Sequence, residues 1–171
     1  MIEVYEDVLS QEVCNELISL FDSTDDKRMH LIDGDTEVFD MYEIPWDNPL
    51  AGYLEEITKE LRKHYLEKYD THHMIPKEYK LEGFRIKRYE PNKHFYPWHS
   101  DVSGLGTCSR YISFLFYLND SEAVTEFADF SIEPKRGSIV MFPPLWMFPH
   151  KAHMPTKAPK YIMSTYYHYD T

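Results

Sequence analysis

The stretch Tyr96–Asp101, which reads YPWHSD, places a histidine and an aspartate two residues apart, and the chain around it decides the fold. Residues i and i+2 of a β-strand face the same side, so His99 and Asp101 would present an imidazole and a carboxylate together. The same spacing recurs at His168 and Asp170, so the pair alone is not specific. A third ligand and further partners must therefore define any metal site.

The third metal ligand has candidates downstream in His150, His153 and, as a weaker choice, His168. Two histidines and one carboxylate on one face of a metal leave three coordination positions open, the pattern of non-haem Fe(II) oxygenases. His150 and His153 would point to opposite faces of a strand, so they are alternatives. The pair at His168 and Asp170 is expected to be a solvated strand end.

The composition fits one compact domain of 171 residues, 43% of them hydrophobic and 16% aromatic. The net charge of −11 argues against a nucleic-acid partner, because phosphate binding needs clustered Lys and Arg. The N-terminus is acidic where a secretory signal would be basic, and no apolar run is long enough to span a bilayer. Cys14 and Cys108 are expected to be reduced thiols. These features predict a soluble, cytoplasmic protein without a membrane partner.

The first 80 residues are predicted to be mostly helical support for the remainder of the chain. Ser10 has the side chain of a helix N-cap and precedes an apolar stripe at helical spacing. A second stripe predicts a helix over about residues 49–69. The polar, acidic stretch 22–47 between them is predicted to be a long loop.

Residues 81–171 change to the period of β-strands. Short alternating or apolar runs are separated by Gly, Pro and Asn turn signals, which favours a barrel or jelly roll. No strand–helix–strand alternation is present, which argues against a doubly wound sheet. The expected strands cover residues 83–89, 94–101, 111–118, 127–132, 137–142 and 161–169.

Two residues stand ten positions from the candidate ligands. Tyr89 precedes His99 by ten and Lys160 follows His150 by ten, whereas His153 lies seven residues before Lys160. Other positions in the same order are Tyr96, Arg110 and Tyr117-Leu118-Asn119. In this pattern the chain resembles the 2-oxoglutarate- and Fe(II)-dependent dioxygenases, in the compact single-domain form of the prolyl 4-hydroxylase branch.

The resemblance implies a mainly β fold, a double-stranded β-helix or jelly roll with about two supporting N-terminal helices, in one domain over residues 1–171. It implies Fe(II) as the metal, 2-oxoglutarate and O₂ as co-substrates, and ascorbate as a reductant. The expected metal ligands are His99, Asp101 and His150; the expected co-substrate residues are Lys160, Tyr89, Tyr117 and Ser164; the expected substrate residues are Arg110, Tyr166 and Trp98.

The reaction that the resemblance implies is hydroxylation of a proline in a peptide or protein, with release of succinate and CO₂. A free amino acid or other small molecule is an alternative substrate, although it would need an extra cation that the sequence does not supply beyond Arg110. A non-catalytic, cupin-like metal-binding protein is a second alternative, against which Lys160 argues. The family's Gly-Gly-Glu-Thr turn is replaced by residues 122–125 without glycines, so substrate details near it are open.

Overall fold

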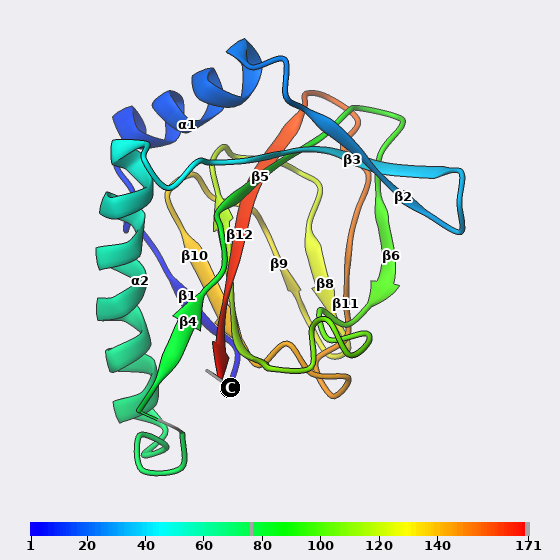
Figure 1. Ribbon diagram of the computed structural model, residues 1–171. Coiled ribbons are helices and arrows are strands. Elements are labelled where there is room, and N and C mark those ends of the chain that lie inside the picture. Colours follow the sequence, from blue (N-terminus) through cyan, green and yellow to red (C-terminus); the bar gives the residue numbers. More distant parts are fainter. Residues whose placement is uncertain (76, 170–171) are drawn as a thin grey trace.

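The computed structural model describes residues 1–75 and 77–169 and shows two antiparallel sheets that face each other (Figure 1). The larger sheet has the order β1-β10-β7-β12-β5-β3-β2, with β4 paired to β12, and the smaller has the order β6-β11-β8-β9. The strands of the larger sheet are β1 (Glu3–Tyr5), β2 (Arg28–Ile32), β3 (Thr36–Glu43), β4 (Tyr79–Leu81), β5 (Arg85–Tyr89), β7 (Arg110–Tyr117), β10 (Ile139–Phe142) and β12 (Lys160–Tyr169). Those of the smaller sheet are β6 (Tyr96–His99), β8 (Thr125–Phe127), β9 (Ser131–Ile132) and β11 (His150–Ala152). The predicted jelly-roll fold is confirmed.

Two helices, α1 (Gln11–Ser23) and α2 (Pro49–Lys68), cover the face of the larger sheet that is turned away from the smaller one (Figure 1). Ser10 caps α1 as expected, since its Oγ accepts a hydrogen bond from the Val13 amide at 3.3 Å. Asn48 caps α2 in the same way through the Leu50 amide at 3.0 Å. Tyr53 of α2 is exposed, whereas its neighbour Leu54 is buried against the sheet.

The alternation of β12 separates two hydrophobic cores. Met163 and Tyr167 pack toward the helices, in a core that includes Leu54 of α2. Ile162 packs between the sheets, in a second core that includes Tyr89. Because successive side chains of a strand point to opposite faces, β12 supports both cores with one run of residues. The space between the sheets is where polar side chains can converge on a ligand.

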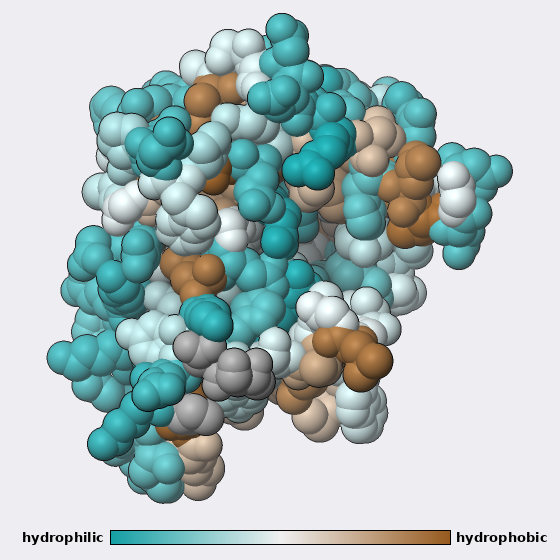
Figure 2. All heavy atoms as spheres, in the orientation of Figure 1, coloured by the Kyte–Doolittle hydropathy of each residue, from teal (hydrophilic) through white to brown (hydrophobic). Residues whose placement is uncertain are grey.

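The prediction of a long loop over residues 22–47 is wrong, because β2 and β3 form an antiparallel hairpin there. The register pairs His30 with Phe39 and Leu31 with Glu37, so Val38 is an extra residue, a β-bulge. The bulge turns both Val38 and Phe39 into the core between the sheets, which breaks the simple alternation that marks a strand in sequence. The apolar spheres at the right edge of Figure 2 lie over this hairpin, where Leu31 is exposed.

Another expectation needs correction, because residues 127–132 do not form one strand. β8 ends at Phe127 and β9 begins at Ser131, and the Phe127 amide donates to the Phe130 carbonyl across the turn between them. Among the described helices, none has the length and apolar character needed to cross a membrane.

Candidate active site

Three side chains that the sequence proposed as metal ligands converge between the sheets. His99 ends β6, Asp101 follows it, and His150 begins β11, opposite His99 in the strand pairing. One ligand atom from each lies within 4.8 Å of the others. The Nε2 atoms of His99 and His150 are 3.8 and 3.9 Å from the same Asp101 oxygen, Oδ1. Two imidazoles and one carboxylate on one side of a small space form the facial arrangement suited to Fe(II).

The other ring nitrogen of each histidine is held by the backbone. Nδ1 of His99 lies 2.8 Å from the Pro97 carbonyl, and Nδ1 of His150 lies 3.3 Å from the Phe148 carbonyl. A carbonyl can only accept, so these contacts place the proton on Nδ1 and leave the Nε2 lone pairs for a metal. Burial and the neighbouring His150 lower the pKa of His99 to about 4, so its ring is neutral at pH 7.

Asp101 is oriented by the larger sheet. Its Oδ1 accepts a hydrogen bond from the Tyr166 hydroxyl at 3.0 Å and its Oδ2 accepts one from the Ser113 hydroxyl at 3.2 Å. The Arg110 guanidinium donates to the Asp101 backbone carbonyl at 2.8 Å. Such partners around a ligating carboxylate fix its direction before a metal arrives. Ser113 was not proposed from the sequence, and its only sequence signal is its inward position on the expected strand 111–118.

A bulge in β6 turns Tyr96 and Trp98, the two aromatic residues of YPWHSD, to different sides of the strand. His99 pairs with His150 and Tyr96 with Ala152, so β6 has one residue more than β11 over this span. Tyr96 and His99 therefore face the same side, with their rings stacked at 3.6 Å. Trp98 is 48% exposed, carries the Lys151 ammonium 5.0 Å above its ring, and lines neither cavity at the metal ligands.

Lys160 is fully buried at the start of β12. Its ammonium donates to the Ala123 carbonyl at 2.7 Å and lies 5.8 and 5.9 Å from the ring centroids of Tyr89 and Tyr117. No carboxylate lies within ion-pair distance of it in the described chain, and burial lowers its pKa to about 7. A buried cation without an anion is costly, so this position fits one end of a dicarboxylate.

The neighbouring hydroxyl groups are of two kinds. The Tyr117 hydroxyl donates to Thr125 Oγ1 at 2.8 Å, and burial keeps the pKa values of Tyr117 and Tyr89 above the ordinary phenol value. Ser164 is 3% exposed, and its Oγ has no hydrogen-bond partner among the residues described. An unpartnered buried hydroxyl at a cavity is an observation that fits a polar ligand. Thr125 begins β8, so a strand follows the turn at 122–124 although this turn has no glycines.

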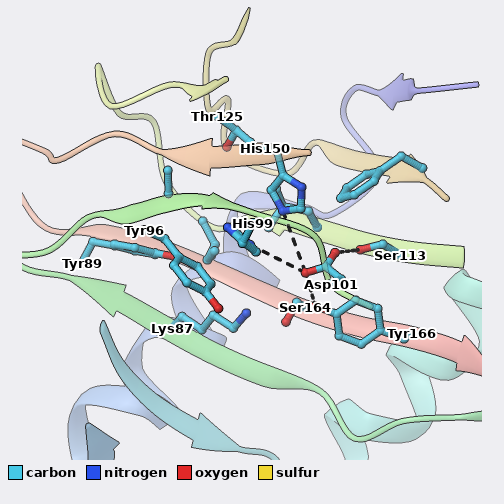
Figure 3. Close-up of a pocket in the computed structure, with 14 residues that line it drawn as sticks. Lys87, Tyr89, Tyr96, His99, Asp101, Ser113, Thr125, His150, Ser164 and Tyr166 are labelled. Atoms are coloured by element: carbon cyan, nitrogen blue, oxygen red, sulfur yellow. Dashed lines mark hydrogen bonds and ion pairs between the residues drawn. The ribbon is translucent and has the colours of Figure 1, made fainter. Parts of the chain in front are cut away.

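Two adjoining cavities meet at the metal ligands. The inner one measures about 30 Å³ and lies between the sheets, and the outer one measures about 290 Å³ and is also lined by the hairpin residues His30 and Phe39. The residues that line both are Lys87, Tyr96, His99, Asp101 and Tyr166. Figure 3 shows Lys87 on β5 reaching into the pocket near Ser164 and Tyr96, below the histidine and aspartate ligands.

Arg110 lines the outer cavity, as expected for a substrate residue, but Glu82 already binds it. Its Nε and Nη2 lie 2.6 and 2.9 Å from the two carboxylate oxygens of Glu82, and its guanidinium is 3.8 Å from the ring centroid of Tyr166. Arg110 therefore positions Tyr166 and the Asp101 carbonyl in this structure.

The histidines that were weaker candidates lie elsewhere. His153 is on the surface beside Glu126, with Nε2 2.5 Å from Oε2. His168 contacts Glu82 and Ser109, and its sequence neighbour Asp170 lies outside the described residues.

Lys87 was not expected at the site, although the sequence carries a signal for it. Lys87 stands two residues before Tyr89, and alternation on one strand places both on the same face. Once Tyr89 is proposed as a site residue, the pattern already predicts a lysine facing the same space.

The fold and the site define a jelly-roll protein with a two-histidine, one-aspartate metal centre, a buried lysine and a polar cavity. Residues 84–168, about half of the chain, match the family model described as the 2OG-Fe(II) oxygenase superfamily. The chain belongs to this superfamily and is a 2-oxoglutarate-dependent dioxygenase, a family that uses Fe(II), 2-oxoglutarate and O₂. No curated protein matches the chain by sequence.

Solved structures share the fold over nearly the whole chain. The viral collagen prolyl hydroxylase of Paramecium bursaria Chlorella virus-1, in complex with 2-oxoglutarate, has a TM-score of 0.72 and 19% identity, covering 97% of this chain and 94% of its own. A Trichoplax adhaerens prolyl hydroxylase bound to a hypoxia-inducible-factor peptide has a TM-score of 0.77 and 14% identity, covering 98% and 83%. The carbocyclase SnoK of nogalamycin biosynthesis has a TM-score of 0.73 and 12% identity, covering 98% and 79%. At these identities the likeness concerns the fold.

Proposed function

We propose that this dioxygenase hydroxylates a proline of a peptide or protein, forming succinate and CO₂ from 2-oxoglutarate. The observation that carries the proposal is the His99–Asp101–His150 cluster together with Lys160, a buried ammonium that has no carboxylate within ion-pair distance in the described chain. Tyr89 connects the two, because it lines the inner cavity with the three ligands and its ring centroid lies 5.8 Å from the Lys160 ammonium. The oxidant is O₂, of which one atom would enter the proline C–H bond and the other would go into succinate; bound Fe(II) and 2-oxoglutarate would supply the chemistry that activates it, which no side chain can provide. The protein holds the metal open on one face, orients the co-substrate and limits water.

The co-substrate roles follow from charge and hydrogen bonding. Lys160 offers a point charge for the far carboxylate of 2-oxoglutarate. Tyr89 and Tyr117 have raised pKa values that keep their phenols protonated, so Tyr89 can donate beside it, and Tyr117 can do so by turning its hydroxyl away from Thr125 Oγ1. Ser164 contributes a buried hydroxyl that is otherwise unpartnered among the residues described. Together these four residues would bind one end of a dicarboxylate while its other end faces the metal ligands.

The outer cavity is the proposed entrance for the substrate. Tyr166 and Arg110 form one wall of it, and the β2–β3 hairpin forms another through His30 and Phe39. Two of the structural relatives, the viral and the Trichoplax enzymes, are prolyl hydroxylases by name. A net charge of −11 would favour the approach of a basic peptide at low ionic strength.

The proposal is tested with purified protein, Fe(II), 2-oxoglutarate, ascorbate and a panel of proline-containing peptides. We expect succinate formation that depends on peptide and a gain of one oxygen atom at proline, measured by mass spectrometry. His99→Ala should abolish both, whereas His153→Ala, a histidine outside the metal cluster, should retain them. Oxygen incorporation only at Lys, Asn or another residue would refute the prolyl assignment, and succinate formation by His99→Ala at the wild-type rate would refute the metal site.

A further inference from the structure

Lys87 is a second lysine at the site that the proposed chemistry does not use. It lies in the middle of β5, lines both the inner and the outer cavity, and its ammonium stands 4.9 Å from the ring centroid of Phe39. Within residues 1–75 and 77–169, its side chain has no hydrogen bond and no ion pair. Burial lowers its pKa to about 8, which still leaves most of it protonated at pH 7.

The other cations of the outer cavity are already paired. Arg85 lies 2.6 Å from Glu82 and 3.0 Å from Glu43. Arg110 binds Glu82 through two nitrogens. Of these three basic side chains, Lys87 is therefore the one without a carboxylate at ion-pair distance in the described chain; Asp101 and Glu82 act on it only from farther away. Lys87 is half-buried, and a charge withdrawn from water normally has a partner, so an unpaired ammonium at a cavity indicates an anionic ligand.

Lys87 lies farther along the sheet than Lys160, the lysine proposed to bind the co-substrate. Lys160 pairs with Tyr89 across β12 and β5, while Lys87 pairs with Ile162, two residues farther along both strands. This spacing is about 7 Å along the sheet, toward the outer cavity. The charges already assigned also cancel: Fe(II) with Asp101 carries one net positive charge, and 2-oxoglutarate with Lys160 carries one net negative charge. Lys87 adds a positive charge that none of these groups balances.

We propose that Lys87 binds a carboxylate of the substrate, so that an acid group enters the pocket close to the carbon that is hydroxylated. This inference rests on the proposed function, because it assumes that a substrate C–H bond is brought to the metal. A carboxylate fits better than a phosphate, since one ammonium matches one negative charge. The carboxylate can come from a free amino acid or from an acidic side chain beside the target residue.

Two matched pairs of probes distinguish these sources. The first pair is free L-proline and L-prolinamide; the second is a blocked peptide with proline next to Asp and the same peptide with Asn in its place. Binding to the protein loaded with Fe(II) and 2-oxoglutarate is measured by calorimetry without oxygen, for the wild type, Lys87→Met and Lys87→Arg. Lys87→Met keeps the length of the side chain without its charge.

The acidic member of at least one pair should bind the wild type about tenfold or more tighter than its neutral partner, the range for a charge-assisted hydrogen bond. Lys87→Met should remove that preference and Lys87→Arg should retain most of it. Affinity for 2-oxoglutarate, measured on the Fe(II)-loaded protein, should change less than twofold in Lys87→Met and fall sharply in Lys160→Met. Retained co-substrate binding also shows that Lys87→Met is folded.

Three results would overturn the inference: no preference for either acidic probe in the wild type, a preference that survives in Lys87→Met, or a loss of 2-oxoglutarate affinity equal to that of Lys160→Met. Mass spectrometry of the same probes tests the proposed function separately. A Lys87-dependent carboxylate preference with no oxygen added to any proline would refute the prolyl assignment alone. Proline hydroxylation without any carboxylate preference would refute only the role of Lys87.

Discussion

Each metal ligand is oriented by a neighbouring group that is not itself one of the three ligands. The Pro97 carbonyl holds the ring of His99, the Tyr166 hydroxyl holds Asp101, and both contacts exist in the protein alone. Because the ligands are already turned toward one another, metal binding costs little side-chain ordering. The affinity of the site should therefore depend on residues that touch no metal.

Tyr166→Phe tests this dependence on a single hydroxyl group. The substitution keeps the buried ring and removes the hydrogen bond to Asp101 Oδ1, so metal affinity should fall about tenfold. Titration with Mn(II), a redox-inert substitute for Fe(II), measures the change. Tyr161→Phe is the matched control, because its hydroxyl contacts Asp22 at the surface, away from the site. Equal affinities for the two variants would contradict the role of Tyr166.

Lys160 should destabilise the protein in the absence of its ligand, and the cost should depend on pH. Burial lowers the pKa of Lys160 to about 7 from 10.5 in a free chain, so between these values the unfolded state binds more protons. Stability then rises with pH across that window, and the penalty is greatest below about pH 7. We expect Lys160→Met to be more stable than the wild type at pH 7 by at least about 1 kcal/mol. Denaturant melts from pH 7 to 10 should show this difference shrinking; a constant difference would contradict it.

Two β-bulges, one in β3 and one in β6, shape the pocket. They are also the places where the sequence does not predict which face of the strand a side chain lies on. The extra residue at Val38 turns it and Phe39 inward together, and the bulge in β6 brings Tyr96 beside His99. Period-two alternation predicts the faces of β5 and of the first half of β12 well, because the pairing between these segments is regular. It fails at a bulge, since pairing with the neighbouring strand, not local sequence, decides where the extra residue lies. In β6 the extra residue brings Tyr96, which alternation places opposite His99, onto the same side as His99, whereas Trp98 stays on the other face and lines neither cavity at the metal ligands.

The turn before β8 lacks the glycines of the family, and the sequence did not predict what replaces them. In place of glycines, Glu122 Oε1 accepts hydrogen bonds from the Thr156 amide at 2.8 Å, the Thr156 hydroxyl at 2.9 Å and the Lys157 amide at 3.0 Å. These bonds connect the turn before β8 to the turn before β12, and they lower the pKa of Glu122 to about 2. The next residue, Ala123, supplies the carbonyl that holds Lys160.

Glu122→Ala should therefore loosen this connection and lower the melting temperature by roughly 2–4 °C, the shift for about 1 kcal/mol in a protein of this size. The depressed pKa means that the contribution of Glu122 is present above pH 4.5 and is lost as the pH falls toward 2. Glu133→Ala is the control, because Glu133 is exposed and has no hydrogen bond or ion pair among the residues described. Indistinguishable thermal melts of the two variants near pH 7 would show that the turn does not depend on Glu122.

At the scale of the whole molecule, the site lies between the two sheets and takes parts from both. His99 and His150 come from β6 and β11 of the smaller sheet, while Ser113 and Tyr166, which hold Asp101, come from β7 and β12 of the larger one. The resemblance to the dioxygenases, carried by the spacing of the candidate residues, predicted the three ligands, but neither Ser113 nor the role of Tyr166 in holding Asp101. It could not predict that Glu82 pairs with Arg110, since that contact depends on where the loop before β5 ends.

A ligand that binds between the sheets should stabilise the whole fold, because it joins the two layers. A ligand that binds only the folded state, present at 100 times its dissociation constant, adds about 2.7 kcal/mol to the free energy of unfolding. We therefore expect Mn(II) with 2-oxoglutarate to raise the melting temperature by roughly 5–10 °C. His99→Ala should lose most of this rise, while His153→Ala, whose ring contacts Glu126 on the surface, should keep it. An equal rise in both variants would mean that the metal binds elsewhere, for example at the exposed group of Asp70, His72 and His73.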